Sequence, residues 1–60
     1  MNIILNGSFK EVPDNLTAGG LIFELGLTNT RLALEINQQI VPRSTFETHH
    51  IKPDDKVEIV

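Results

Sequence analysis

Residues 3–12 read IILNGSFKEV, and the predicted fold depends on this stretch more than on any other. Three apolar residues are followed by Asn6-Gly7 and then by a second strand-forming run at 8–12. Asn-Gly is typical of the two-residue turn between antiparallel strands, because both residues accept the positive φ angles that this turn requires. We therefore expect a β-hairpin at the start of the chain.

A helix is predicted after the hairpin. Its apolar residues recur with helical spacing and would form one face: Ala18, Leu21, Ile22 and Leu25. Thr17 precedes them and can accept a hydrogen bond from a free amide of the first turn. Gly26 supplies the left-handed residue that commonly ends a helix, with Leu27 beyond it for a capping contact.

Three further short strands are predicted, at 32–36, 40–41 and 56–60, of which the first and last alternate apolar and polar residues. Pro42 ends the middle one, because proline has no amide proton for a strand ladder. Residues 44–50 are expected to cross the molecule irregularly or as a single helical turn. Phe46 and Ile51 are the expected anchors of this crossing in the core.

This element order predicts one domain over residues 1–60, of the α+β class, with a mixed four- to five-stranded sheet packed on one helix. A hairpin, a crossing helix and a late strand that returns parallel to the first is the order of the β-grasp, or ubiquitin-like, fold. The expected core joins the inward residues of the strands and the helix: Ile3, Leu5, Leu34, Ile36, Val57, Ile59, Leu21, Ile22 and Leu25.

The composition of the chain argues against several classes of partner and site. The chain carries five basic and eight acidic residues, and the basic ones are scattered, so nucleic acid is not an expected partner. There is no cysteine, which excludes a disulfide, a thiolate metal site and a cysteine nucleophile. The N-terminus has neither a signal peptide nor a membrane span, so no membrane partner is expected and a cytoplasmic protein is the default.

Residues 32–46, LALEINQQIVPRSTF, resemble the stretch around VNxxIVPR in the sulfur carriers of thiamine biosynthesis. The resemblance continues at Asn6 and Thr17, and through the closing residues 55–60, so it spans essentially the whole chain. Gly19-Gly20 departs from the family, which usually has polar or alanine residues there.

The resemblance implies a protein co-substrate and not an enzyme. In this family an adenylating, E1-like activating enzyme uses ATP to activate the carrier's C-terminal carboxylate, sulfur replaces AMP to give a thiocarboxylate, and thiazole synthase takes the sulfur. The carrier itself is expected to bind no cofactor. The reactive Gly-Gly of the family is not present after Val60 in this sequence, and we expect a truncated or omitted mobile tail.

Two alternatives stay open from the sequence. A ubiquitin-like protein-interaction module would bind partners through its sheet and never use its terminus. A molybdopterin-type sulfur carrier would share the fold and differ in the acceptor of the sulfur. A small enzyme has little support, because no catalytic or ligand cluster is visible and a domain of this size has little room for a cleft.

The expected partner interface comprises Ile4, Phe23, Arg43, Glu58 and Val60. Alternation or helical phase turns the three apolar residues of this set away from the core, and an exposed apolar patch often marks a partner surface. Arg43 could pair with an acidic patch on a partner or cap the turn that follows it.

Three other pairs invite a functional interpretation, and for each we favour a structural one. Gly19-Gly20 would be tolerated in the first helical turn, and no phosphate-loop pattern surrounds it. His49-His50 lacks an obvious third ligand, so no metal is expected. Asp54-Asp55 follows Pro53 as turn residues usually do, so no catalytic residue is expected.

Overall fold

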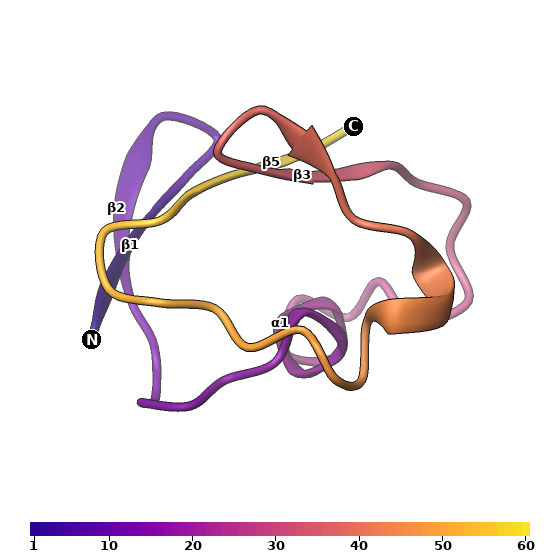
Figure 1. Cartoon of the computed structure of the whole chain (residues 1–60), viewed down its shortest axis with the longest axis horizontal. Helices are drawn as coiled ribbons and strands as arrows, with labels where there is room; N and C mark the ends of the chain where they lie inside the picture. The colour runs from indigo at the N-terminus through magenta and orange to yellow at the C-terminus, as the bar shows by residue number, and fades with distance from the viewer.

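The computed structural model describes all residues, 1–60, and shows five strands in one mixed sheet with a helix on one side (Figure 1). The elements are β1 (Asn2–Leu5), β2 (Ser8–Glu11), α1 (Ala18–Glu24), β3 (Leu34–Ile36), β4 (Gln39–Ile40), the short 3₁₀ helix η1 (Arg43–Thr45) and β5 (Lys56–Ile59). The strand order across the sheet is β2-β1-β5-β3-β4. The predicted β-grasp fold is confirmed, with the last strand parallel to the first at the sheet centre.

The first hairpin forms as predicted. Asn6 and Gly7 have φ angles of 47° and 86°, which are the left-handed values that a two-residue hairpin turn needs. β1 and β2 pair antiparallel on either side of this turn, with Ile4 opposite Phe9.

Capping holds the short helix α1 at both ends. The Thr17 hydroxyl accepts a hydrogen bond from the Gly20 amide at 3.0 Å, as predicted. At the other end Gly26 is left-handed, with φ 72°, and its amide donates to the carbonyl of Phe23 while the amide of Leu27 donates to that of Ile22. These two bonds form a Schellman motif, which satisfies carbonyls that the helix leaves free.

Three strands are shorter than predicted, including β2, which ends at Glu11 and not at Val12, and one strand is shifted by a residue. β3 begins at Leu34 and β5 ends at Ile59, although Ala33 and Val60 still exchange two backbone hydrogen bonds at 2.9 and 3.0 Å. β4 comprises Gln39–Ile40, not 40–41, because Pro42 has no amide proton with which to continue the ladder beyond the buried Val41. The Val41 amide nevertheless donates to the carbonyl of Leu34.

The core lies between the sheet and α1. Of the predicted core residues, six are buried and three, namely Leu5, Leu25 and Ile59, are partly buried against them. Phe46 and Ile51 are buried, so both predicted anchors are confirmed. Val12 and Val41, which follow the hairpin and β4, and Ala18 at the start of α1 complete the core.

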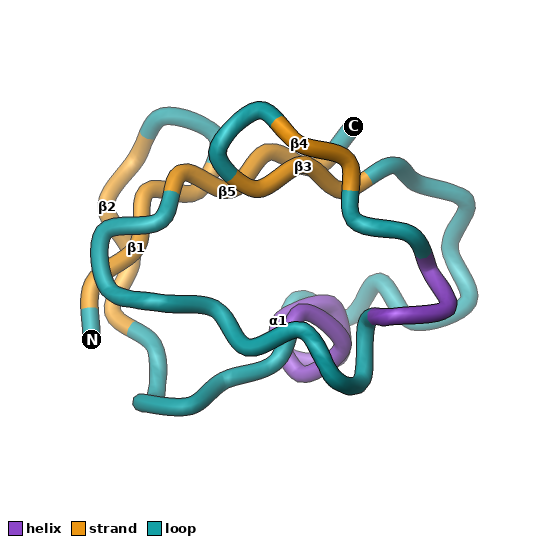
Figure 2. Tube along the Cα trace, in the orientation of Figure 1, coloured by secondary structure: helices purple, strands orange, loops and turns teal.

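Residues 42–55 close the domain as a long connection around the helix (Figure 2). The connection is fastened to the start of α1 by two backbone hydrogen bonds of 2.9 Å, from Ala18 to the carbonyl of His49 and from Gly19 to that of Phe46. A Cβ on Gly20 would lie 2.8 Å from Cδ1 of Leu16, so the first helical turn is closely packed. No helix in the chain is long and apolar enough to cross a membrane.

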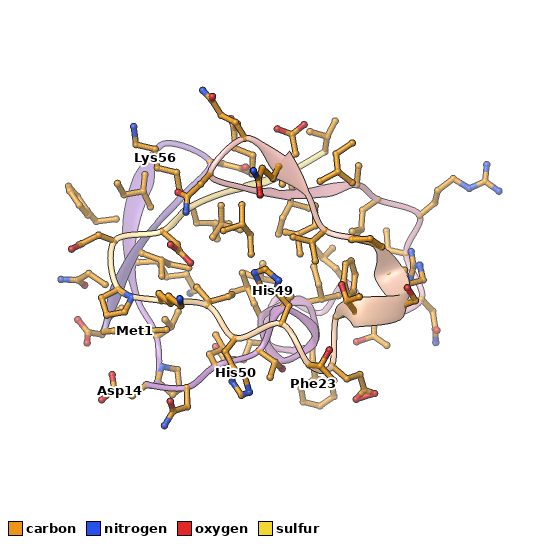
Figure 3. All side chains as sticks on the ribbon, in the orientation of Figure 1. Met1, Asp14, Phe23, His49, His50 and Lys56 are labelled. Carbon is orange, nitrogen blue, oxygen red and sulfur yellow. The ribbon has the colours of Figure 1, made fainter.

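The N-terminal ammonium group of Met1 lies between two acidic side chains, and Asp14 is seen beside it in Figure 3. It donates to Asp14 Oδ1 and Glu11 Oε2, both at 3.2 Å, and to the Val12 carbonyl at 2.6 Å. The hydrogen bonds to Asp14 and Glu11 raise the pKa of this amine above its ordinary value of 8.0.

The two glycines at the ends of α1 should respond oppositely to alanine. Gly19→Ala adds a Cβ at an ordinary contact distance of 3.4 Å from the Phe46 carbonyl, and should raise the free energy of unfolding by about 0.5–1 kcal/mol through helix propensity. Gly26→Ala should lower it by about 1–2 kcal/mol, because φ is positive there. Urea denaturation measures both, and a destabilising Gly19→Ala would show that the Phe46 carbonyl cannot accommodate the methyl group.

The stability of the domain should fall at alkaline pH. A pKa raised in the folded state contributes stability that is complete below the unfolded pKa and is lost as the pH rises through the folded pKa. The free energy of unfolding should therefore decline from about pH 8 upward, and the decline should be smaller after acetylation of the Met1 amine. Urea titrations of both forms from about pH 7 to about pH 10 test this, and equal slopes would contradict it.

Candidate functional site

The outer face of the sheet, on the side away from α1, carries an exposed apolar side chain on the edge strand β2 and a half-buried one beside it on β1. Ile3 is fully buried, so alternation turns Ile4 outward, and the register places Ile4 beside Phe9 of β2 and Lys56 of β5. Phe9 is 79% exposed. A pair of apolar side chains on an open sheet face offers a docking surface for another protein.

The other half of this outer face combines carboxylates with further apolar residues. Glu35 of β3 lies opposite Glu58 of β5 on one side and opposite Ile40 of β4 on the other. Ile40 is 71% exposed, and neither carboxylate forms a salt bridge within the chain. Two like charges directly opposite each other repel, and a cation on a partner would relieve this repulsion.

The five predicted interface residues divide between two sides of the molecule. Ile4, Glu58 and Val60 belong to the outer sheet face, where Val60 continues the alternation of β5 and is 86% exposed. Phe23 projects from α1 on the opposite side, as its position relative to Lys56 in Figure 3 shows. Arg43 lies with Phe23 around a cleft of about 380 Å³.

Arg43 is held by contacts within the domain. Its Nη2 donates to the Thr30 carbonyl at 3.2 Å, and its guanidinium carbon lies 5.8 Å from the centre of the Phe46 ring. The side chain thus joins the loop after α1 to the core anchor Phe46. It does not cap the turn that follows it, since the bond there runs from the Phe46 amide to the Arg43 carbonyl.

Phe9 and Ile40 belong to the outer face, and the sequence analysis did not select them. A signal for Phe9 was present, because a two-residue turn at Asn6-Gly7 pairs residues 4 and 9 and so puts Phe9 on the same face as Ile4. Ile40 had no such signal, because the two-residue run Ile40-Val41 does not indicate which of the two faces the core, and the register opposite Glu35 decides it.

Of the other pairs considered in the sequence, Gly19-Gly20 and Asp54-Asp55 form hydrogen bonds within the domain. The amides of Gly19 and Gly20 both donate within the domain, to the Phe46 carbonyl and the Thr17 hydroxyl. The Asp55 carboxylate accepts hydrogen bonds from the Lys52 amide at 2.8 Å and from Asn37 Nδ2 at 3.0 Å, which is the role of a turn residue. His49 and His50 lie in the connection beside Asp55, around a shallow hollow.

The end of β5 emerges from the centre of the sheet. Val60 pairs with Ala33 beyond β3, and the Asn6 side chain contacts the backbone of Ile59 on the other side. The segment that follows Val60 in a longer chain would therefore leave from a strand held on both sides, next to the outer sheet face.

Known proteins resemble the chain over its full length. A solved structure of the thiamine biosynthesis protein (ThiS) from Geobacter metallireducens superposes with a TM-score of 0.91 at 25% identity, covering 100% of this chain and 91% of that one. A thiazole synthase from Paramagnetospirillum magneticum is 33% identical over 60 residues, which is 100% of this chain and 18% of that protein. The chain thus spans under a fifth of the length of that relative.

A third relative, the uncharacterized protein ycf40 of Porphyra purpurea, is 32% identical over 60 residues, which cover 100% of this chain and 84% of that protein. The model of the ThiS family matches residues 3–60, and thus nearly every position of the β-grasp domain described above. The chain therefore belongs to the ThiS family.

Proposed function

We propose that this chain is the folded body of a sulfur carrier for thiazole formation, which presents its C-terminal end to partner enzymes in the cytoplasm. The observation that carries the proposal is the position of β5. It is the central strand, and its end emerges beside an exposed face that bears Ile4, Phe9, Ile40 and Val60. A partner docked on that face would have the end of the chain within its reach.

The chemistry occurs at the C-terminal carboxylate and requires no catalytic group from the carrier. In the activating enzyme a carboxylate oxygen attacks the α-phosphate of ATP and pyrophosphate leaves. Hydrosulfide then attacks the acyl carbon of the adenylate, the bond to AMP breaks, and loss of AMP and a proton gives the thiocarboxylate. A Gly-Gly end would suit this step, because residues without Cβ atoms can follow a narrow channel to the nucleotide. ATP is bound by the partner.

Two partners follow from this function, an adenylating enzyme of the E1 type and thiazole synthase. Support for the second comes from the two thiazole synthases, of Paramagnetospirillum magneticum and Magnetococcus marinus, in which a segment similar to this whole chain makes up 18% of the protein. In those proteins a domain resembling this one is covalently joined to the remainder. Such a connection raises the effective concentration of one domain at the other.

The charges on the docking surface indicate which side chains a partner is expected to place against it. Glu35 and Glu58 face each other on the outer sheet face without a salt bridge, between Ile4 and Phe9 on one side and Ile40 on the other. We expect each partner to place an arginine or lysine there and apolar side chains on either side. Charge pairs of this kind favour specificity and the rate of association.

The carrier role predicts a covalent change. The chain extended to its natural C-terminal end, incubated with ATP, a sulfur donor and the activating enzyme, should gain the mass that corresponds to replacement of one oxygen by sulfur. Intact mass spectrometry measures the product, and omission of ATP is the control. An unchanged mass, with a Gly-Gly end verified in the starting material, would exclude the carrier function.

The docking face can be located with matched charge insertions. Phe9→Asp, and separately Ile4→Asp, should weaken binding to the activating enzyme by about tenfold or more, because each buries a carboxylate in an apolar contact. Phe23→Asp is the matched control, since Phe23 is 75% exposed against 79% for Phe9 but lies on the helix side. We expect its dissociation constant to change less than about twofold.

Calorimetric titration provides the dissociation constants, and circular dichroism confirms that each variant is folded. The reverse pattern, a loss of binding with Phe23→Asp alone, would move the docking surface to the cleft beside Arg43. In that case the outer sheet face would not be the surface that the activating enzyme recognises.

A further inference from the structure

The last residues of β5 have an unusual set of hydrogen-bond partners. In an antiparallel pair, successive residues direct their backbone groups alternately toward and away from the neighbouring strand. Val60 directs its amide and carbonyl to Ala33, at 3.0 and 2.9 Å. The amide and carbonyl of Ile59 therefore point to the other side, toward β1.

No backbone group of β1 forms a hydrogen bond with Ile59. It pairs in parallel with β5 only as far as Leu5 and Val57, and the chain then turns away at Asn6 and Gly7. The last backbone bond on this side runs from the Asn6 amide to the Val57 carbonyl, at 2.8 Å. Without another partner, the amide of Ile59 would have to be satisfied by solvent.

The side chain of Asn6 takes the place of the missing strand. Its Oδ1 accepts a hydrogen bond from the Ile59 amide at 2.9 Å, and its Nδ2 lies 3.4 Å from the Ile59 carbonyl, the longer and weaker of the two contacts. A carboxamide presents one acceptor and one donor, as a peptide group does. Asn6 thus continues the ladder along β5 by one residue.

Turn geometry alone does not explain this contact. Asn15 and Asn29 also have positive φ angles, of 64° and 66°, and neither forms a side-chain hydrogen bond. Asn37 provides a parallel at the opposite end of β5, where its Oδ1 accepts from the Lys56 amide at 3.0 Å. Each end of the central strand is therefore bonded by an asparagine from a neighbouring hairpin turn.

We infer that Asn6 is a positioning residue for the carrier reaction: by bonding Ile59, it fixes the direction in which the segment after Val60 leaves the sheet. This inference rests on the proposed function, in which that segment carries the reacting carboxylate. A C-terminal segment that leaves the sheet in one fixed direction spends more time in the geometry that the reaction requires. Docking on the outer sheet face does not involve Asn6 and should be unaffected.

Two substitutions separate the bond from the turn. Asn6→Gly removes the carboxamide and keeps a residue that accepts positive φ, and Asn6→Asp keeps an oxygen acceptor for the Ile59 amide and loses the Nδ2 donor. Asn29→Gly is the matched control, because it makes the same change at a left-handed asparagine without a side-chain hydrogen bond. All are made in the chain extended to its natural end.

Amide hydrogen exchange measures the bond directly. In Asn6→Gly the exchange of the Ile59 amide should accelerate about fivefold, the factor that corresponds to one hydrogen bond of about 1 kcal/mol, while that of Val60 changes less than about twofold. Asn6→Asp should restore most of the protection. Unchanged Ile59 exchange in Asn6→Gly would overturn the inference.

Kinetics of adenylation by the activating enzyme tests the positioning. Asn6→Gly should lower kcat about fivefold to tenfold with KM nearly unchanged, Asn6→Asp should recover part of the loss, and Asn29→Gly should resemble the wild type. An equal loss in Asn29→Gly, or a change confined to KM, would overturn the positioning role. If the wild-type carrier is not activated at all, the proposed function fails and the positioning role with it, while the exchange rates still decide whether Asn6 holds Ile59.

Discussion

The pairing of β5 with β1 on one side and β3 on the other is the interaction on which the domain depends. β1 and β2 form one hairpin and β3 and β4 another, and no strand of the first pairs with a strand of the second. Val57, fully buried, lies at this junction between Leu5 and Ile36. Parallel pairing of β1 with β5 requires a long connection between them, and α1 with the residues around it forms that connection and covers the inner face.

This arrangement makes one strand serve two purposes. The inward side chains of β5 hold the core together, and its outward side chains and its end belong to the candidate docking face. In the proposed function the cargo is attached at the end of the chain, so a rigid body and a well-placed end are sufficient. The caps of α1 and the closely packed first turn at Gly20 contribute rigidity that a seven-residue helix would not have alone.

The features of the fold that depend on a few neighbouring residues could be predicted from the sequence. The Asn6-Gly7 turn, the Thr17 cap and the Gly26 terminus are each set by a few neighbouring residues, and all three are confirmed. The start of β3 and the end of β5 were not, because these two strands pair with each other across more than twenty residues of chain. The bounds of β4 were wrong by one residue, because a run of two apolar residues does not define the register with β3. The bond from Asn6 to Ile59 joins residues 53 positions apart, so no local pattern could reveal it. Phe23 and Ile4 were both selected as outward-facing apolar residues, and the register of β1 with Lys56, together with the position of Phe23 on the helix side, places them on opposite sides of the molecule.

The parallel placement of β1 and β5 also has a mechanical consequence. A partner that draws the end of the chain into a channel pulls along β5, whereas the hydrogen bonds to β1 and β3 run across the strand. Such a pull loads these bonds together in shear instead of opening them one after another. The geometry therefore resists extraction of the strand. A partner can hold the end of the chain during a reaction and then release it without disrupting the sheet.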